Sequence, residues 1–407
     1  MKKTLLIVSG GVQALHGIKR AKEFGCHVVV SDMDPKAPGF ALADDRLIAS
    51  TYDVAETVAA AQHYHHTVRP IDGVITIGSD VPLTVASVAD RLGLISIPIE
   101  AARLAQDKLA MKRRFVEAGI SVPWFAAISS PQALKNIVAT RGFGLVVKPV
   151  DSRGSRGVQR LSPGMDLDAV WERAVTQSPT QRVMVEEFLP GPQISTESIL
   201  IDGEGFTPGF SDRNYEYLER YAPFFIENGG DLPSALPDRV QEAVKRTAEA
   251  AGRALGIRTG NVKGDIVVVN GKPHVIELAA RASGGYFCTR EIPLNTGVDF
   301  IGAVIKIAVG EHVSAEDLRP KRLTPIVQRY AFPRPGRVSS IAGLDDARRV
   351  PGIEEVIVTV EPGDEISAPT HSGCTAAMVL ATGNSVEAAR TSAAAALAAL
   401  RIETVGA

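Results

Sequence analysis

The sequence predicts an α/β protein of two or three domains. With 407 residues, of which 45% are hydrophobic and 22% charged, the chain is long enough for more than one buried core. In residues 1–105, short apolar runs alternate with helical patterns, which is typical of β-α-β units. In residues 326–407, alternating runs and a Gly-Asp turn favour a small antiparallel sheet, on which an Ala-rich helix is expected to pack.

The composition of the chain limits the classes of partner and the cellular compartment that we expect for it. A formal net charge of −2 gives little attraction for nucleic acid or an anionic membrane, so small molecules are the expected partners. Three cysteines, Cys26, Cys288 and Cys374, are far apart and odd in number, which fits a reducing compartment without disulfides. The apolar run near the N-terminus is too short for a signal peptide, and no run reaches membrane-spanning length. We therefore expect a cytoplasmic protein.

A β-α-β unit opens the chain. An apolar run precedes Gly10 and Gly11, a helical pattern follows, and a second apolar run leads to Asp32. Asp32 stands about 20 residues beyond the glycines, where a dinucleotide-binding fold holds a ribose hydroxyl. The glycines lack the G-x-G-x-x-G spacing, however, so we favour a purely structural role over NAD binding.

A second strand and helix are predicted within residues 74–91, joined by a turn that ends on Asp80. We expect the Asp80 carboxylate to cap the helix, with contact to a substrate as the less common alternative. Asp107 and Lys108 then open a helix that ends at Gly119 and leads into a separate α/β segment. This change of pattern places a domain boundary near residue 105.

Lys148 interrupts an apolar strand, LVVKPV, predicted at 145–150. A lysine is costly to bury in such a strand unless an anion meets it. The next residues, 151–157, are rich in glycine, serine and arginine, whose backbone N–H groups and guanidiniums could fold over a polyphosphate. A flexible hairpin tip is the alternative for the loop alone. The chain contains no G-x-x-x-x-G-K-[ST] motif, so this is not a Walker A loop.

The strand predicted at 183–189 stops at a Pro-Gly-Pro turn, and another strand runs over 194–201. A strand that stops in this way leaves backbone groups free to bind a flat heterocycle. Gln193 and Glu197, four residues apart in an extended segment, are expected to face one side.

Two carboxylates, Asp265 and Glu277, lie in a predicted hairpin whose turn contains Asn270 and Gly271. A three-residue loop with Gly271 in the left-handed conformation would put both carboxylates on one face, whereas a strict two-residue turn would separate them. Carboxylates on one face repel unless a cation lies between them, and Mg²⁺ is often held by one or two carboxylates plus substrate phosphates. Two solvated acids at strand ends are the alternative.

Donor groups follow this hairpin closely. Arg281 comes four residues after Glu277, and Ser283, Gly284 and Gly285 come directly afterwards. A guanidinium and bare backbone N–H groups suit a carboxylate or a phosphate. They favour a cation site at the hairpin over two solvated acids.

The order of these features resembles the ATP-grasp superfamily of ligases. The features are the helix with Asp107 and Lys108, the strand lysine Lys148, the loop 152–157, the strand end 186–189, and Asp265, Glu277 and Arg281. The units before them resemble the domain that precedes ATP-grasp domains in biotin carboxylase, carbamoyl phosphate synthetase, purine-pathway ligases and L-amino acid ligases. The pattern E-x-A-x-R-x-S-G-G at 277–285 looks most like the L-amino acid ligase and carbamoyl-phosphate-synthetase-like branches.

This resemblance covers nearly the whole chain and implies three domains. They are a Rossmann-like pre-ATP-grasp domain at 1–105, a two-lobed ATP-grasp domain at 106–325 and a small antiparallel α+β domain at 326–407. In the family, the last of these closes the site, so Arg329 or His371 could reach into it.

The resemblance also implies roles for individual residues. Lys108 and Lys148 would contact the phosphates of ATP, under a closing loop that contributes Ser152, Gly154, Ser155 and Gly157. Adenine would lie against the backbone of Glu186, Glu187, Phe188 and Leu189, with Gln193 at the ribose. Asp265 and Glu277 would bind Mg²⁺ or Mn²⁺, Arg281 and Lys148 would act in catalysis, and an acyl phosphate would be held by Arg281, Ser283, Gly284 and Gly285.

Two positions depart from the family pattern. Many relatives carry Glu at the position of Gln193 and Asn, a further metal ligand, at the position of Ala279. Glutamine can still accept a hydrogen bond from ribose, whereas Ala279 offers a metal nothing. A second magnesium ion would therefore be held less tightly.

The resemblance implies an ATP-dependent ligase that joins a carboxylate to an amine through an acyl phosphate and releases ADP and phosphate. The segment 209–236 is long enough for a substrate loop, with Asp212, Arg213, Tyr215 and Glu227 as candidate contacts. An NAD-dependent oxidoreductase and a nucleotide sensor without turnover remain alternatives. The oligomeric state is open, with a homodimer as one option.

Overall fold

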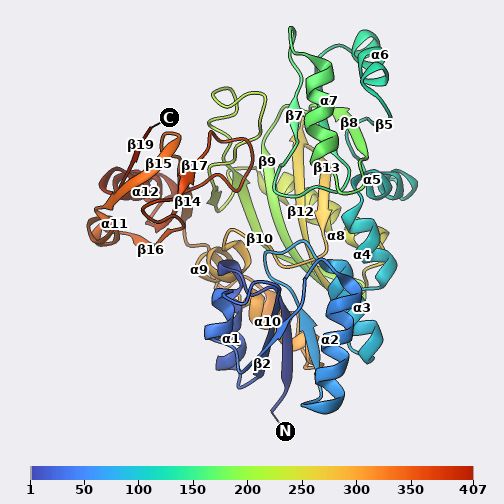
Figure 1. Cartoon of the computed structure of the whole chain (residues 1–407), viewed down its shortest axis with the longest axis vertical. Coiled ribbons are helices and arrows are strands. Elements are labelled where there is room, and N and C mark those ends of the chain that lie inside the picture. The colour runs from blue at the N-terminus through green and yellow to red at the C-terminus, as the bar shows by residue number, and fades with distance from the viewer. Residues whose placement is uncertain (1, 407) are drawn as a thin grey trace.

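The computed structural model describes residues 2–406, and its N-terminal part is a parallel four-stranded sheet (Figure 1). The strand order is β3-β2-β1-β4, and the predicted β-α-β start is confirmed. The strands are β1 (Thr4–Val8), β2 (His27–Asp32), β3 (Asp45–Ile48) and β4 (Gly73–Ile75). The helices are η1 (Val12–Ala14), α1 (Leu15–Glu23), η2 (Pro38–Ala41), α2 (Val54–Thr67), α3 (Pro82–Leu92) and α4 (Ile99–Gln106). The apolar run of β1 is buried along its whole length, as expected for a strand covered on both faces.

A small antiparallel sheet follows, in the order β5-β8-β6-β7. Its strands are β5 (Phe125–Ile128), β6 (Leu145–Pro149), β7 (Gln159–Arg160) and β8 (Val183–Glu187). The helices α6 (Pro131–Arg141) and α7 (Leu167–Thr176) enclose one core with it, through residues such as Leu134, Val147 and Val170. Helix α5 (Lys108–Glu117) instead packs its buried Met111 and Phe115 into the core of the larger sheet.

An eight-stranded antiparallel sheet lies at the centre, in the order β13-β12-β9-β10-β11-β14-β18-β16. Its strands are β9 (Gln193–Ile201), β10 (Glu204–Arg213), β11 (Gly230–Leu232), β12 (Gly260–Val269), β13 (Lys272–Ala279), β14 (Ile326–Ala331), β16 (Ile353–Val358) and β18 (Ala377–Thr382). Helix α8 (Asp238–Ala254) covers one face with a stripe that includes Val240, Val244 and Ala251. Because β11 pairs with β14, the sheet continues past residue 325 into the C-terminal part.

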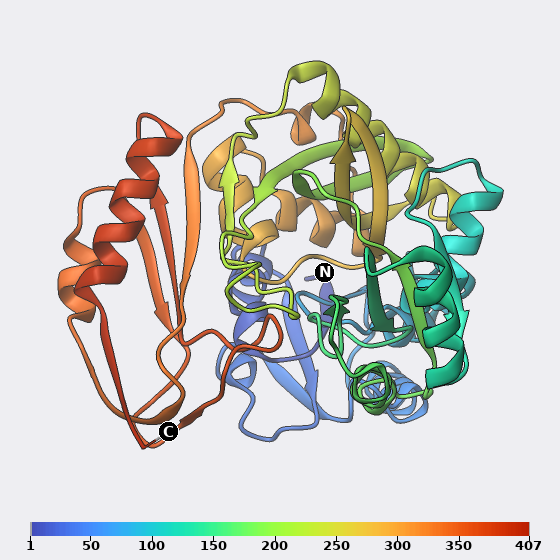
Figure 2. The same ribbon diagram turned by 90° about the horizontal axis from the view of Figure 1, so that it is seen from above.

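The C-terminal part adds a three-stranded sheet, β17-β15-β19, and two helices. These elements are β15 (Gly336–Ala342), α11 (Leu344–Arg349), β17 (Glu365–Ile366), α12 (Val386–Ala399) and β19 (Arg401–Val405). The Ala-rich helix α12 packs on β14 and β18 through Ala389, Ala393 and Ala396, which confirms the predicted packing (Figure 2). Small side chains allow this close approach.

The segment between β13 and β14 joins the N-terminal sheet to the large sheet. It contains the π-helix η3 (Phe287–Glu291), α9 (Ile292–Thr296), α10 (Phe300–Ala308) and η4 (Glu316–Leu318). Helix α10 is almost entirely apolar and lies against α1 and β4, so that Phe300 and Ile305 share a core with Leu5 and Ile18. The N-terminal sheet is thereby fixed to the body of the molecule.

Gly73 offers a test of how α10 docks on β4. A Cβ atom at position 73 would lie 2.6 Å from the carbonyl oxygen of Ala308, which is backbone and has little freedom to move. We expect Gly73→Ala to lower the free energy of unfolding by about 1–3 kcal/mol in urea denaturation. Gly144→Ala is the control, since a Cβ there meets nothing within 4 Å. Equal effects of the two substitutions would contradict the tight docking.

Candidate active site

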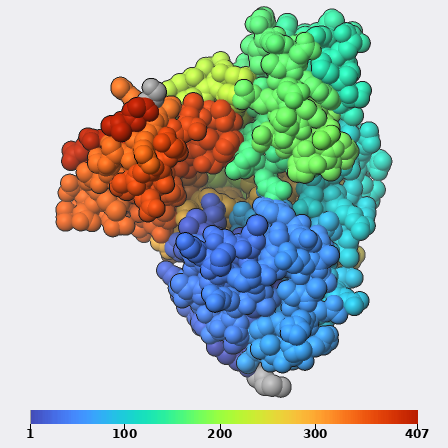
Figure 3. All heavy atoms as spheres, in the orientation of Figure 1, coloured from blue at the N-terminus to red at the C-terminus, as the bar shows by residue number. Residues whose placement is uncertain are grey.

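A cavity lies between the small sheet and the large sheet. Figure 3 shows the surface hollowed where the N-terminal part, the small sheet and the C-terminal part meet. The structure brings most of the predicted site residues to the cavity wall: Lys108, Lys148, Ser152, Gly154, Ser155, Glu186, Glu187, Phe188, Leu189, Gln193, Arg213, Asp265 and Glu277. Gly157, Asp212, Glu227, Arg281, Ser283, Gly284 and Gly285 do not line it.

A buried ion cluster forms one wall of this cavity. Glu186 on β8 accepts from Lys148 Nζ of β6 at 2.6 Å, and its other oxygen lies 2.9 Å from Lys112 Nζ of α5. All three side chains are nearly or completely buried. Sequence reasoning missed Lys112. Its position four residues after Lys108, on the same helix face, was the available signal.

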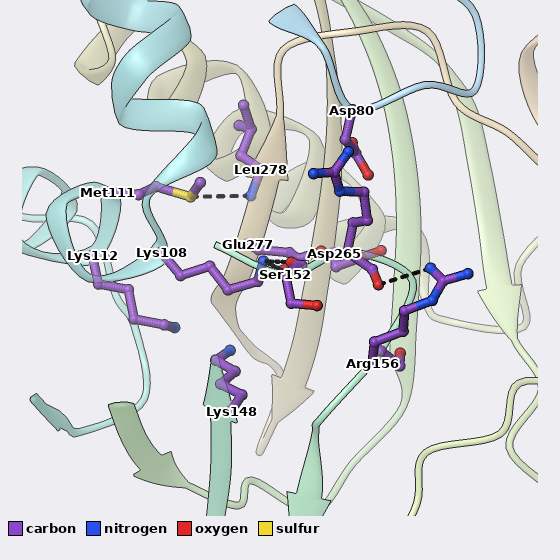
Figure 4. A network of polar contacts seen from close by, with 12 residues as sticks. Asp80, Lys108, Met111, Lys112, Lys148, Ser152, Arg156, Asp265, Glu277 and Leu278 are labelled. Carbon is purple, nitrogen blue, oxygen red and sulfur yellow. Dashed lines mark hydrogen bonds and ion pairs between the residues drawn. The ribbon is translucent and has the colours of Figure 1, made fainter. Parts of the chain in front are cut away.

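Lys108 connects α5 to the glycine-rich loop and to the hairpin. Its Nζ donates to the carbonyl oxygen of Ser152 at 2.6 Å and lies 3.4 Å from Glu277 Oε2. Burial alone would raise the pKa of the Glu277 carboxyl, but Lys108, Lys148 and Lys263 hold that pKa well below its usual value. Figure 4 shows Lys108, Lys112 and Lys148 converging on this region. Glu277 is therefore ionised beside three lysines.

Asp265 and Glu277 are cross-strand partners, but the predicted turn is wrong. The hairpin has a two-residue turn, Asn270-Gly271, in which both residues have positive φ and Val269 pairs with Lys272. A bulge at Ile276 shifts the register, so that Ile266 pairs with Val275 while Asp265 pairs with Glu277. The extra residue of the bulge therefore puts both carboxylates on one face of the hairpin, as a third turn residue would have done.

The carboxylate pair fits a hard cation that also binds phosphate. Asp265 already attracts positive groups, with Arg213 Nη1 at 2.8 Å from its Oδ1 and Lys263 also paired to it. Within residues 2–406 no group of three or more His, Cys, Asp or Glu side chains could hold a metal. A magnesium ion held here would take two protein ligands and complete its oxygen shell with phosphates and water.

The glycine-rich loop is held from two other parts of the chain. The guanidinium of Arg153 lies 4.1 Å from the ring centre of Tyr52, in the N-terminal part. On the other side, Ser372 N–H donates to the carbonyl oxygen of Gly154 at 3.1 Å. Gly154 and Ser155 have positive φ values of 59° and 61°, a conformation that turns successive N–H groups inward. His371 lies beside this loop, where burial and the charge of Arg156 lower its pKa.

Aromatic side chains surround the predicted adenine segment. The ring of Phe188 is 6.2 Å from that of Phe225, and the Arg160 guanidinium lies 4.4 Å from the Phe188 ring centre. The N–H groups of Glu187 and Phe188 donate to Trp124 and Gly144 within the small lobe. Backbone hydrogen bonds from this segment to a base would therefore use its remaining groups.

Arg281 lies outside the main cavity and pairs with Asp80. Its Nε is 2.6 Å from Asp80 Oδ1, although 201 residues separate the two in sequence. Asp80 therefore does not cap α3, whose N-cap residue is Val81 and has no side-chain cap. Arg281 also lines a second cavity, together with Thr76 and Asn261.

Two of the three backbone donors after Arg281, those of Ser283 and Gly285, are not bare, which corrects the sequence prediction. Ser283 N–H donates to Glu197 at 3.0 Å, and Gly285 N–H donates to Gln13 Oε1. The Ser283 hydroxyl accepts from Cys288 N–H, and Cys288 is a buried wall residue. Sequence spacing could not reveal Gln13, which comes from the other end of the chain.

The remaining candidates have internal partners. Asp212 accepts from Ala235 N–H at 2.8 Å and from the Ser234 hydroxyl. Glu227 pairs with both donor sides of Arg213. Arg329 pairs with Asp231 at 2.9 Å. In the N-terminal part, Asp32 accepts from Gly10 N–H at 2.8 Å, so its carboxylate shapes the loop where NAD binding was considered.

Two family models match parts of this chain. Residues 105–285 match the family model of the ATP-grasp domain, and residues 329–405 match that of the L-amino acid ligase C-terminal domain 2. The uncharacterized protein y4rH of Sinorhizobium fredii is 24% identical over 90% of this chain and 76% of its own length. The D-alanine–D-alanine ligase of Cupriavidus metallidurans is 29% identical over 44% of this chain and 55% of that ligase.

A solved structure shares the fold over the whole chain. The L-amino acid ligase of Bacillus licheniformis superimposes with a TM-score of 0.83 and 21% identity, over 100% of this chain and 99% of that one. The chain thus has the ATP-grasp fold. Residues 105–285 belong to the ATP-grasp domain family, and residues 329–405 belong to the family of L-amino acid ligase C-terminal domain 2.

The buried carboxyl of Glu197 should make the stability of the fold depend on pH. Burial raises the pKa of Glu197 to about 7, against hydrogen bonds from Ser283 and the charges of Arg281 and Lys263. A carboxyl whose pKa is raised by folding stabilises the fold in its protonated form. Its contribution is complete below the ordinary pKa of 4.5 and is lost as pH rises through 7.

Glu197→Gln should therefore gain stability relative to the wild type as pH rises from 5 to 8, by about 2–3 kcal/mol in urea denaturation. The neutral amide can still accept from Ser283 N–H and does not titrate. Glu172→Gln, at an exposed position of α7, is the control and should show no such trend. Parallel pH curves for Glu197→Gln and the wild type would contradict the assignment.

Proposed function

We propose that this protein is an ATP-dependent ligase that joins a carboxylate to an amine and releases ADP and phosphate. One observation carries the proposal: two lysines, Lys108 and Lys148, line one cavity together with two cross-strand carboxylates. Phosphoryl transfer needs positive groups at the phosphates and a cation between phosphate and protein carboxylates. The family models and the relatives support the same chemistry.

Lys108 and Lys148 are the groups that we assign to the phosphates of ATP. Both line the cavity, and Lys108 also ties the carbonyl of Ser152 to the same region. The loop residues Ser152, Gly154 and Ser155 would add backbone and hydroxyl donors from above. The segment 186–189, with Phe225 beside Phe188, would form a slot for a flat base, with Gln193 near the ribose.

Asp265 and Glu277 are the groups that we assign to Mg²⁺ or Mn²⁺. Glu277 is held in its ionised form by the surrounding lysines, so no proton has to leave before a cation binds. The metal would supply charge neutralisation on the phosphate oxygens. Arg213 and Lys263, which now pair with Asp265, would give way in part or share its oxygens.

The carboxylate substrate belongs on the side of Arg281. Burial would lower the pKa of Arg281, but the Asp80 carboxylate raises it, so the guanidinium is charged and its direction is fixed. The carboxylate oxygen would attack the terminal phosphorus, and the amine would then displace phosphate from the acyl phosphate. Since Ser283 and Gly285 N–H groups already have partners, Arg281 and Gly284 are the better candidates for holding the acyl group. We keep Glu227 as the candidate contact for the amine.

We also propose the domain limits 1–105, 106–325 and 326–407, and a cytoplasmic location. The family models support the first boundary and the beginning of the third domain. Buried Cys26 and Cys288 as free thiols fit a reducing compartment. Among residues 2–406, no helix has the length and apolar character needed to cross a bilayer.

Release of ADP should depend on both a carboxylate and an amine. We expect a panel of amino acids, tested in pairs with ATP and Mg²⁺, to contain pairs that release ADP and phosphate. Glu277→Gln should lower kcat by about 100-fold or more, because a carboxylate that holds the neutralising cation is lost. Glu172→Gln is the matched control on an exposed helix and should keep normal turnover.

Three outcomes would contradict the proposal. Release of AMP and pyrophosphate would indicate adenylation. ATP binding without turnover for any acid and amine would favour a nucleotide sensor, which the absence of a metal ligand at Ala279 first suggested. Normal turnover of Glu277→Gln would remove the metal assignment.

A further inference from the structure

Glu186 is a buried carboxylate that serves two buried ammonium groups. Lys148 Nζ lies 2.6 Å from one oxygen, and Lys112 Nζ lies 2.9 Å from the other. The two lysines come from different elements, β6 and α5, and are 3% and 0% exposed. Lys112 Nζ has one further contact, at 3.4 Å from the carbonyl oxygen of Val275.

This arrangement is costly as a purely structural device. One lysine would neutralise Glu186, and a second buried ammonium adds a desolvation penalty that one shared carboxylate does not offset. An apolar side chain at position 112 would fill the same space between α5 and the sheets without that penalty. The extra positive charge therefore needs another explanation.

The two lysines differ in what they face. Lys148 lines the main cavity, whereas Lys112 does not. If Lys148 were the only partner of Glu186, the two side chains would form a neutral ion pair. A phosphate would then have to compete with the carboxylate for Lys148. With Lys112 on its other oxygen, Glu186 is already balanced, so Lys148 retains charge and donors for an anion in the cavity.

We propose that Lys112 is a positioning residue for the triphosphate: by sharing Glu186, it leaves Lys148 free to bind the phosphate chain of a nucleotide. The inference rests on the proposed function, because it assumes that a nucleotide triphosphate occupies the main cavity. Helix α5 would then contribute to phosphate binding directly through Lys108 and indirectly through Lys112. These two lysines lie one turn apart on the same face of the helix.

The protonation of Lys112 supports this role. Burial and the charge of Lys148 lower the pKa of Lys112 to about 8, against the attraction of Glu186 and Glu277. These groups lie on β6, β8 and β13, the elements that carry its charged neighbours. As pH rises through 8 in the nucleotide-free protein, Lys112 loses its charge and Glu186 turns to Lys148 alone. Affinity for the triphosphate should then fall.

The test compares binding of ATP and of adenosine to the full chain by calorimetry. Lys112→Met should raise the Kd for ATP by about 10- to 100-fold while leaving the Kd for adenosine unchanged, since only the phosphates feel the lost charge. Lys148→Met should give the same pattern. Lys135→Met, which removes an exposed lysine paired with Asp168, is the control and should change neither Kd.

A second variant tests whether Lys112 acts through Glu186. In Lys112→Met/Glu186→Gln, a neutral amide no longer captures Lys148, so ATP affinity should return to within about threefold of the wild type. The ratio of the Kd of Lys112→Met to that of the wild type should also shrink as pH rises from 7 to 9. A merely structural lysine would give neither the rescue nor this pH trend.

The outcomes separate this inference from the proposed function. If the wild type binds no ATP, the proposed function fails. If the wild type binds ATP and Lys112→Met binds it equally well, only the present inference fails. Equal loss of ATP and adenosine binding, or a double variant no better than Lys112→Met, would show a structural role and overturn the inference.

Discussion

The ion cluster around helix α5 is the interaction on which the rest of the site depends. Lys108 and Lys148 line a cavity, and Lys112 is buried next to them; Glu186 and Glu277 are the anionic partners of these lysines. Lysines in a partly dry site are stable only with anions nearby, so the cavity is prepared for more negative charge than the protein itself supplies. A polyphosphate would supply this negative charge, and the cross-strand carboxylates Asp265 and Glu277 could bind its cation.

The fold supplies each part of this cluster from a different layer. Strands β6 and β8 of the small sheet carry Lys148 and Glu186, while the large sheet carries Asp265 and Glu277. Helix α5 packs on the large sheet through Met111 and Phe115 and directs its lysines into the gap. The glycine-rich loop is held by Tyr52 from the N-terminal part and by Ser372 from the C-terminal part. The glycine-rich loop of the ATP-grasp part is therefore fixed by contacts with both of the other parts.

Several features could be predicted from local pattern because local physics determines them. The apolar runs became strands, the Ala-rich helix packs on its sheet, and a lysine inside an apolar strand indicated an anion. The facing of Asp265 and Glu277 was also predictable, although a bulge at Ile276 and not a longer turn produces it. A bulge has no reliable signature in the local sequence, because it depends on which residues of the two strands pair in the folded sheet.

Other features depend on contacts between distant segments, and the sequence could not indicate them. Asp80 looked like a helix cap but receives Arg281, and Gly285 looked like a bare donor but binds Gln13. Lys112 follows Lys108 by one helical turn, but nothing in the sequence around it shows that Glu186 is its partner. In each case the partner is supplied by tertiary packing.

The most direct test of the account follows an oxygen atom. An amino acid that supports ADP release would be labelled with heavy oxygen in its carboxylate, and the released phosphate would be analysed by mass spectrometry. The account predicts one labelled oxygen in each phosphate, because the carboxylate oxygen attacks the terminal phosphorus of ATP. Product formed with unlabelled phosphate would contradict it.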